Sequence, residues 1–76
     1  MSAELKMYTV YDRPKDFPNN IVVRCHRIGP GTVTPDPFPC LIGYELEGVR
    51  TILRGKGLTN IGRQPEDDPK IVEVWV

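Results

Sequence analysis

The sequence has few of the residues from which catalytic and metal sites are usually built. It contains one histidine and two cysteines, and no apolar run approaches the roughly 20 residues that a membrane helix needs. Ten basic residues balance ten acidic ones, so the chain has no net charge. This balance argues against a generically basic nucleic-acid binder and against a wholly acidic DNA mimic. The N-terminus also lacks a signal-peptide pattern, and we expect a cytoplasmic protein that does not enter a membrane.

The reactive side chains do not form a recognisable catalytic or metal-binding pattern. Cys25 and His26 are adjacent on an expected strand, so their side chains face opposite sides and cannot form a nucleophile–base pair. Two cysteines and one histidine do not supply the four ligands of a zinc site. We expect Cys25 and Cys40 to be free thiols, with Cys25 acting as a small buried hydrophobe. The sequence therefore predicts no enzymatic activity and no cofactor.

The composition favours strands over helices. One alanine stands against eight valines and six isoleucines, and β-branched side chains favour the pleated sheet. Eight prolines and seven glycines interrupt the chain and leave room for only one helix of any length. At 76 residues the chain forms a single domain, 1–76, with a small core.

Hydrophobic periodicity places the elements along the chain. Strands are expected at residues 5–11, 21–28, 58–63 and 70–76, with a short extended piece at 40–42. A helix is expected over residues 44–54, where Leu46, Val49, Ile52 and Leu53 form one apolar stripe. The predicted class is α+β. Its order is β-β-α-β-β, a small antiparallel or mixed sheet of about four strands with the helix packed on one face.

Two glycines bear on the expected helix. Gly55 is suited to the left-handed position that ends many helices. Gly48 lies inside the helix, where glycine costs roughly 1 kcal/mol relative to alanine. It therefore indicates either a close backbone approach or a marginal helix.

The segment 29–39 is rich in proline and glycine. Its prolines at 35, 37 and 39 favour an extended, polyproline-like path and exclude pairing as a central strand. We expect a connector on the surface, with Phe38 turned inward.

One helix covers only one face of a sheet, so side-chain alternation decides what is left on the other face. We expect Ile21, Val23 and Cys25 to lie under the helix together with the valines at 72, 74 and 76. The open side would then hold Arg24, His26, Glu73 and Trp75, with Tyr8 as a further candidate. Such a set is either an ordinary cross-strand cluster or a recognition surface, because tryptophan, tyrosine and arginine are enriched at binding hot spots.

Charge is segregated toward the C-terminal half. A basic patch is formed by Arg50, Arg54, Lys56 and Arg63. An acidic turn follows at Glu66, Asp67 and Asp68. These segments are either a solvated helix face beside a polar turn, or a bipolar surface that docks onto a charged protein or blocks a nucleic-acid channel.

The two ends of the chain carry a resemblance. Residues 7–18 (MYTVYDRPKDFP) and 21–24 (IVVR), and then 57–58 (GL), 63–69 (RQPEDDP) and 71–75 (IVEVW), resemble small proteins encoded by bacteriophages and prophages. The resemblance spans roughly half of the chain. It implies a cofactor-free inhibitor of host defence, in particular an anti-CRISPR protein that binds a type I effector complex and blocks DNA binding or nuclease recruitment. The partner would be a host protein or ribonucleoprotein complex, and the inhibitor a monomer or weak dimer.

Two other classes of function are open at this point. The first is a direct nucleic-acid binder that uses the basic patch with Trp75 or Tyr8 as a stacking platform. The second is a structural phage component that assembles through exposed edge strands.

Overall fold

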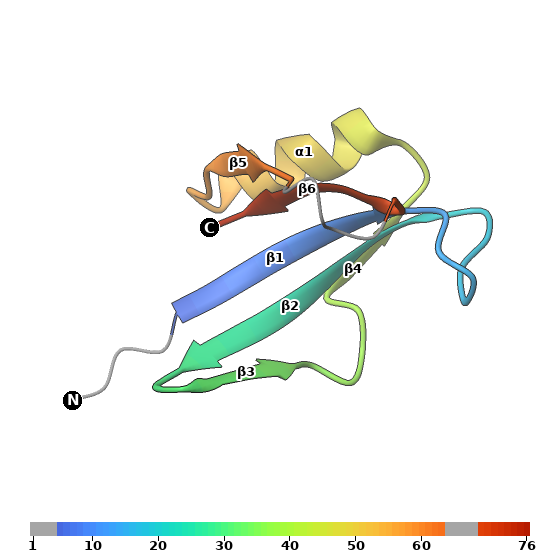
Figure 1. Ribbon diagram of the computed structural model, residues 1–76. Coiled ribbons are helices and arrows are strands. Elements are labelled where there is room, and N and C mark those ends of the chain that lie inside the picture. The colour runs from blue at the N-terminus through green and yellow to red at the C-terminus, as the bar shows by residue number, and fades with distance from the viewer. Residues whose placement is uncertain (1–4, 64–68) are drawn as a thin grey trace.

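The computed structural model describes residues 5–63 and 69–76, and Figure 1 shows how they are arranged. The elements are β1 (Leu5–Asp12), β2 (Ile21–Gly29), β3 (Thr32–Pro35), β4 (Leu41–Gly43), α1 (Leu46–Gly55), β5 (Asn60–Gly62) and β6 (Ile71–Trp75). The α+β class with one helix is confirmed. The sheet, however, has six strands within these residues instead of about four, and every pairing is antiparallel.

A long hairpin forms the centre of the sheet. β1 and β2 pair without a break from Leu5 opposite Ile28 to Asp12 opposite Ile21. The strand order is β3-β2-β1-β6-β5, and β4 also pairs with β2. The last strand of the chain thus lies beside the first, with Thr9 opposite Val74.

The segment 29–39 lies on the surface and forms no central strand, as expected, but its residues Thr32–Pro35 pair as an edge strand, β3, instead of serving only as a connector. β3 pairs with the C-terminal half of β2, and Pro35 lies opposite His26. Gly31 has a φ of 71°, which the tight turn between the strands requires of its second central residue. Pro35 is tolerated because β3 is an edge strand, where the missing N–H removes no interior ladder bond.

Phe38 is also placed differently from the expectation, since its side chain is 78% exposed. The backbone on either side of it is held against β2: the Asp36 N–H donates to the Cys25 carbonyl and the Cys40 N–H to the Val23 carbonyl, each at 2.9 Å. The two carbonyls belong to residues that are only two positions apart on β2, whereas Asp36 and Cys40 are four positions apart. The chain between Asp36 and Cys40 therefore forms an outward loop.

α1 ends in a Schellman motif centred on Gly57, two residues after the expected glycine. The helix continues through Gly55, and Gly57 takes the left-handed conformation with a φ of 81°. The Gly57 N–H donates to the Arg54 carbonyl at 3.0 Å, and the Leu58 N–H to the Leu53 carbonyl at 3.3 Å. No helix within residues 5–63 and 69–76 has the length and hydropathy to span a membrane.

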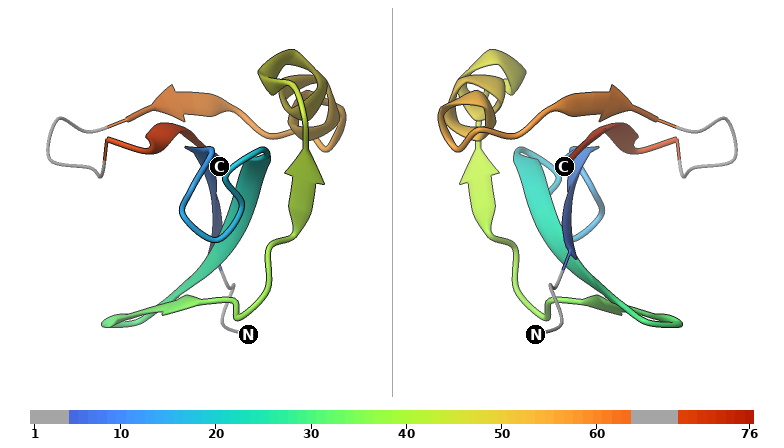
Figure 2. Two further views of the ribbon diagram at one scale, coloured as in Figure 1. Left: turned by 90° about the vertical axis from the view of Figure 1, so that its right-hand side faces the viewer. Right: turned by 90° about the vertical axis from the view of Figure 1, so that its left-hand side faces the viewer.

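The core lies between α1 and one end of the sheet. Val49 and Leu53 of α1 pack against Val10, Val23 and Trp75, all of them buried. Figure 2 shows α1 beside β4, while β3 and the far end of the hairpin extend beyond the helix.

The close backbone approach considered for Gly48 occurs at Gly43 instead. A Cβ at Gly43 would lie 2.9 Å from Cγ2 of Val49, whereas a Cβ at Gly48 would meet no atom within 4 Å. The absence of a side chain at Gly43 therefore lets β4 and α1 pack together. No neighbouring atom requires a glycine at position 48.

The face expected for Glu73, Val74 and Trp75 of the last strand is wrong, whereas Val72 packs against the core as expected. Trp75 lies opposite Tyr8, and Glu73 lies opposite Val10, so both point toward α1. Val74 faces the other side, opposite Thr9. Tyr8 also lies on the α1 side and packs against the core. The expectation for Ile21, Val23 and Cys25 is confirmed, because all three are buried on the α1 side.

Candidate binding surfaces

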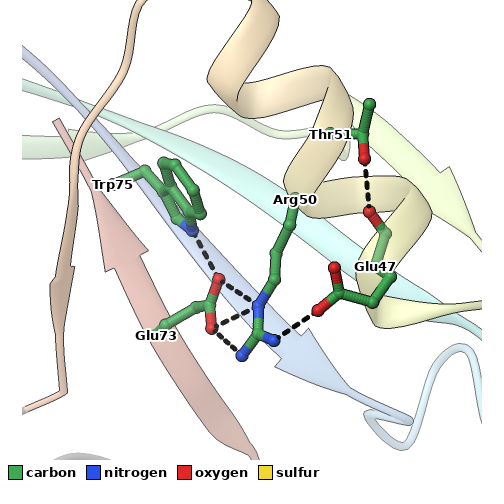
Figure 3. A network of polar contacts seen from close by, with 5 residues as sticks. All are labelled: Glu47, Arg50, Thr51, Glu73 and Trp75. Carbon is green, nitrogen blue, oxygen red and sulfur yellow. Dashed lines mark hydrogen bonds and ion pairs between the residues drawn. The ribbon is translucent and has the colours of Figure 1, made fainter.

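Glu73 is the centre of a polar network that joins α1 to β6 (Figure 3). Its Oε1 accepts a hydrogen bond from Nη2 of Arg50 at 2.7 Å, and its Oε2 accepts one from Nε1 of Trp75 at 2.6 Å. Arg50 also donates from Nη1 to Oε1 of Glu47 at 2.8 Å. Glu73 is only 2% exposed and Trp75 only 3%. The network therefore explains how a carboxylate can lie on the core side of β6.

The same contacts fix the charges of the pair. Burial opposes ionisation of Glu73, but the hydrogen bonds from Arg50 and Trp75 outweigh it and lower the pKa of this carboxyl. The hydrogen bonds to Glu73 and then to Glu47 raise the pKa of Arg50. Trp75 therefore lies under α1 and not on the open face, and Arg50 is engaged within the fold.

The remaining residues of the predicted basic patch lie on the surface. Arg54 and Lys56 are exposed at the C-terminal end of α1, and Arg63 is exposed after β5. The acidic turn Glu66, Asp67 and Asp68 lies outside the described residues. The structure thus separates Arg50 from the exposed part of the patch.

The sheet face opposite α1, here called the open face, contains a hollow of about 330 Å³. His26 of β2 lines it, with Met7 and Thr9 of β1 and Ile61 of β5. Oγ1 of Thr9 lies 3.4 Å from Nδ1 of His26. Because β2 and β5 line one hollow although β1 and β6 separate them, the sheet curls toward this side. We call this feature the His26 hollow.

An apolar row continues the open face beyond the His26 hollow. Leu5 lies opposite Ile28 and Ile28 opposite Val33, so these three side chains share one face across β1, β2 and β3. Leu5 is 65% exposed and Val33 60%. This row was not predicted, because side-chain alternation was used to assign the faces of β2 and β6 but not those of β1 and β3.

Arg24 and His26 lie on the open face as expected. Arg24 is opposite Thr9, and His26 is opposite Met7. Arg24 forms an ion pair with Asp16 of the loop between β1 and β2. His26 is half-buried and lines the hollow, and Ile28 of the apolar row follows it on the same face of β2.

A second hollow, of about 370 Å³, lies on the α1 side, and we call it the lysine hollow. Lys6 of β1 and Lys56 after α1 both line it. Its walls are Leu41, Ile52 and Leu53, and its other polar groups include Asp36, Cys25 and Cys40. Because Cys25 lines this hollow and His26 the other one, the expectation that they face opposite sides is confirmed.

Both thiols of the lysine hollow are free. Burial, followed by the neighbouring Asp36, raises the pKa of Cys25. Burial, followed by the nearby Cys25, raises the pKa of Cys40. Sγ of Cys40 also lies 3.4 Å from the Val23 carbonyl oxygen, to which the thiol donates. Both thiols are consequently neutral at physiological pH.

In the part of the chain that the structure describes, no three histidine, cysteine, aspartate or glutamate side chains are grouped as a metal site would need. Comparisons of the chain with protein-family models, with curated proteins and with solved structures found no match.

Proposed function

We propose that this protein is a non-enzymatic inhibitor of host defence that acts by binding a host protein or ribonucleoprotein complex. Its specific form is an anti-CRISPR protein that binds a type I effector complex and blocks DNA binding or nuclease recruitment. The resemblance of residues 7–18, 21–24, 57–58, 63–69 and 71–75 to small phage and prophage proteins supports this class.

The observation that carries the binding part of the proposal is the open face. A small domain gains stability from every apolar side chain it buries, yet Leu5 and Val33 are mostly exposed and adjoin the His26 hollow. A contiguous apolar surface beside a concave site is typical of a protein-binding region. The hollow would receive an apolar anchor residue of the partner, and Arg24 and His26 would form the polar rim.

The two alternative functions receive less support from the geometry. A nucleic-acid binder would need the basic patch and a stacking residue, but Arg50 is tied to Glu73 and Trp75 is buried. A component that assembles through its edges would use β3 or β5, but Pro35 of β3 offers no N–H to a further strand and β5 has only three residues. We therefore keep the inhibitor as the leading function.

A plating assay tests the proposal. The protein is expressed in a host whose type I CRISPR system restricts a phage, and plating efficiency is compared with that of an empty vector. Restored plating, with co-purification of the effector complex, is the expected result. Unchanged plating against several type I systems would overturn the anti-CRISPR form of the proposal.

A further inference from the structure

The lysine hollow carries an excess of positive charge. Its acidic side chain, Asp36, is neutralised by Arg27, whose Nε lies 3.0 Å from Oδ1. The ion pairs found among the described residues include neither Lys6 nor Lys56. Because both thiols are neutral, the two lysines leave the hollow with two uncompensated positive charges.

The surface beneath these charges is apolar. Leu53 is fully buried and Leu41 half-buried, and Ile52 on α1 is 46% exposed along the hollow. Lys6 belongs to β1, and Lys56 directly follows α1. The two charges therefore lie on different sides of this apolar surface. A hollow near 370 Å³ is at the small end of the range for small-molecule sites, which begins at about 300 Å³.

We propose that the lysine hollow binds a small organic anion with an apolar body, of the class of a medium-chain carboxylate. The anionic group pairs with Lys6 and Lys56, and the apolar body lies on Leu41 and Ile52. Charge complementarity selects the anion, and burial of apolar surface provides the affinity. This inference goes beyond the proposed inhibitor function and does not depend on it.

Two matched fluorescent probes test the charge selection. The anion 1-anilinonaphthalene-8-sulfonate and the uncharged N-phenyl-1-naphthylamine share an aromatic body and differ by one sulfonate. The native protein is expected to bind the anion more tightly, and its affinity for the anion alone should fall as salt is raised. Equal affinities, or affinities that salt does not change, would overturn the proposal.

Reversing the charges of Lys6 and Lys56 tests whether these two lysines cause the preference for the anionic probe. The variant Lys6→Glu/Lys56→Glu should bind the anion about tenfold or more weakly and the uncharged probe as before. The control Arg13→Glu/Lys15→Glu makes the same charge change in the exposed β1–β2 loop and should leave both affinities unchanged. If both variants weaken anion binding equally, net charge and not the hollow is responsible, and the proposal fails.

Amide chemical shifts in nuclear magnetic resonance spectra place the ligand. Titration with decanoate should shift the amides of Leu41, Ile52 and Lys56, and the variant Ile52→Glu should abolish these shifts. Ile52 is partly exposed, so this variant is expected to fold, and its own spectrum verifies that. Shifts confined to Met7 and His26 would place the ligand in the His26 hollow and overturn the assignment.

Discussion

At the scale of single residues, Glu73 has the most consequential environment in the protein. A carboxylate on the core side of a strand is stable only when its oxygens are hydrogen-bonded, and Arg50 and Trp75 both donate to it. Local alternation places position 73 on one face or the other but does not reveal a partner 23 residues away in the sequence. Alternation alone therefore predicts Glu73 and Trp75 on the open face, where they would be solvated.

Replacing Glu73 tests this account of the core. Glu73→Ala leaves the buried Trp75 N–H without its acceptor and Arg50 with only its exposed partner Glu47, and should lower the free energy of unfolding by about 2 to 3 kcal/mol. Glu47→Gln is the matched control, because Glu47 is the exposed partner of the same arginine and should cost at most about 0.5 kcal/mol. Urea denaturation measures both. Equal effects of the two substitutions would contradict a buried role for Glu73.

The lowered pKa of Glu73 also predicts a pH dependence. The unfolded chain takes up a proton at this carboxyl near the ordinary value of 4.5, and the folded protein only at a lower pH. The ionised carboxylate therefore stabilises the fold above that value, and the stabilisation is lost as pH falls through the folded pKa. Between about pH 6 and pH 2.5, the free energy of unfolding should fall more steeply in the native protein than in Glu73→Gln. Parallel pH profiles would contradict the assignment.

At the scale of elements, two glycines around α1 have opposite expected effects on substitution. Gly48→Ala fills open space within the helix and should raise the free energy of unfolding by about 0.5 to 1 kcal/mol. Gly43→Ala drives a Cβ against the buried Val49 and should lower it by about 1 to 3 kcal/mol. Thermal or urea denaturation of the two variants measures the difference. Stabilisation by both substitutions would contradict the packing of β4 against α1.

The helix and the strands also show which parts of the fold can be predicted from the sequence. The two strands of the central hairpin were found because both are long and combine β-branched with other strand-favouring residues, tyrosines in β1 and valines and isoleucines in β2. α1 was found because its apolar stripe repeats at helical spacing. β3 was missed because its proline reads as a break, although an edge strand accepts one. The end of α1 was placed at the wrong glycine because Gly55 and Gly57 are equally suited to it, and only the hydrogen bonds of Leu58 and Gly57 distinguish them.

For the candidate sites, the positions on β2 were predictable and their surroundings were not. Alternation from Ile21 places Arg24 and His26 on the open face without further information. The His26 hollow requires the curl of the sheet that brings Ile61 toward β2, and the lysine hollow requires Lys6 and Lys56 to meet across two elements. Both hollows depend on contacts between residues that are far apart in the sequence, and hydrophobic periodicity does not predict such contacts.

At the scale of the whole molecule, the two faces of the sheet differ in what covers them. The α1 side holds the core and the Glu73 network, while the open face presents Leu5, Ile28 and Val33 beside the His26 hollow. α1 covers only one end of the sheet, so the hairpin projects beyond it (Figure 1). The central claim is that this projecting open face binds the target.

The measurement that tests this claim most directly is the affinity of the purified protein for a purified type I effector complex. The variant Leu5→Asp/Val33→Asp changes two exposed residues, so it should keep the native stability and bind at least about a hundredfold more weakly. The charge-matched control Thr51→Asp/Tyr44→Asp changes exposed residues of α1 and of the segment before it, and should bind like the native protein. Native affinity in the first variant, or equal loss in both, would contradict the account.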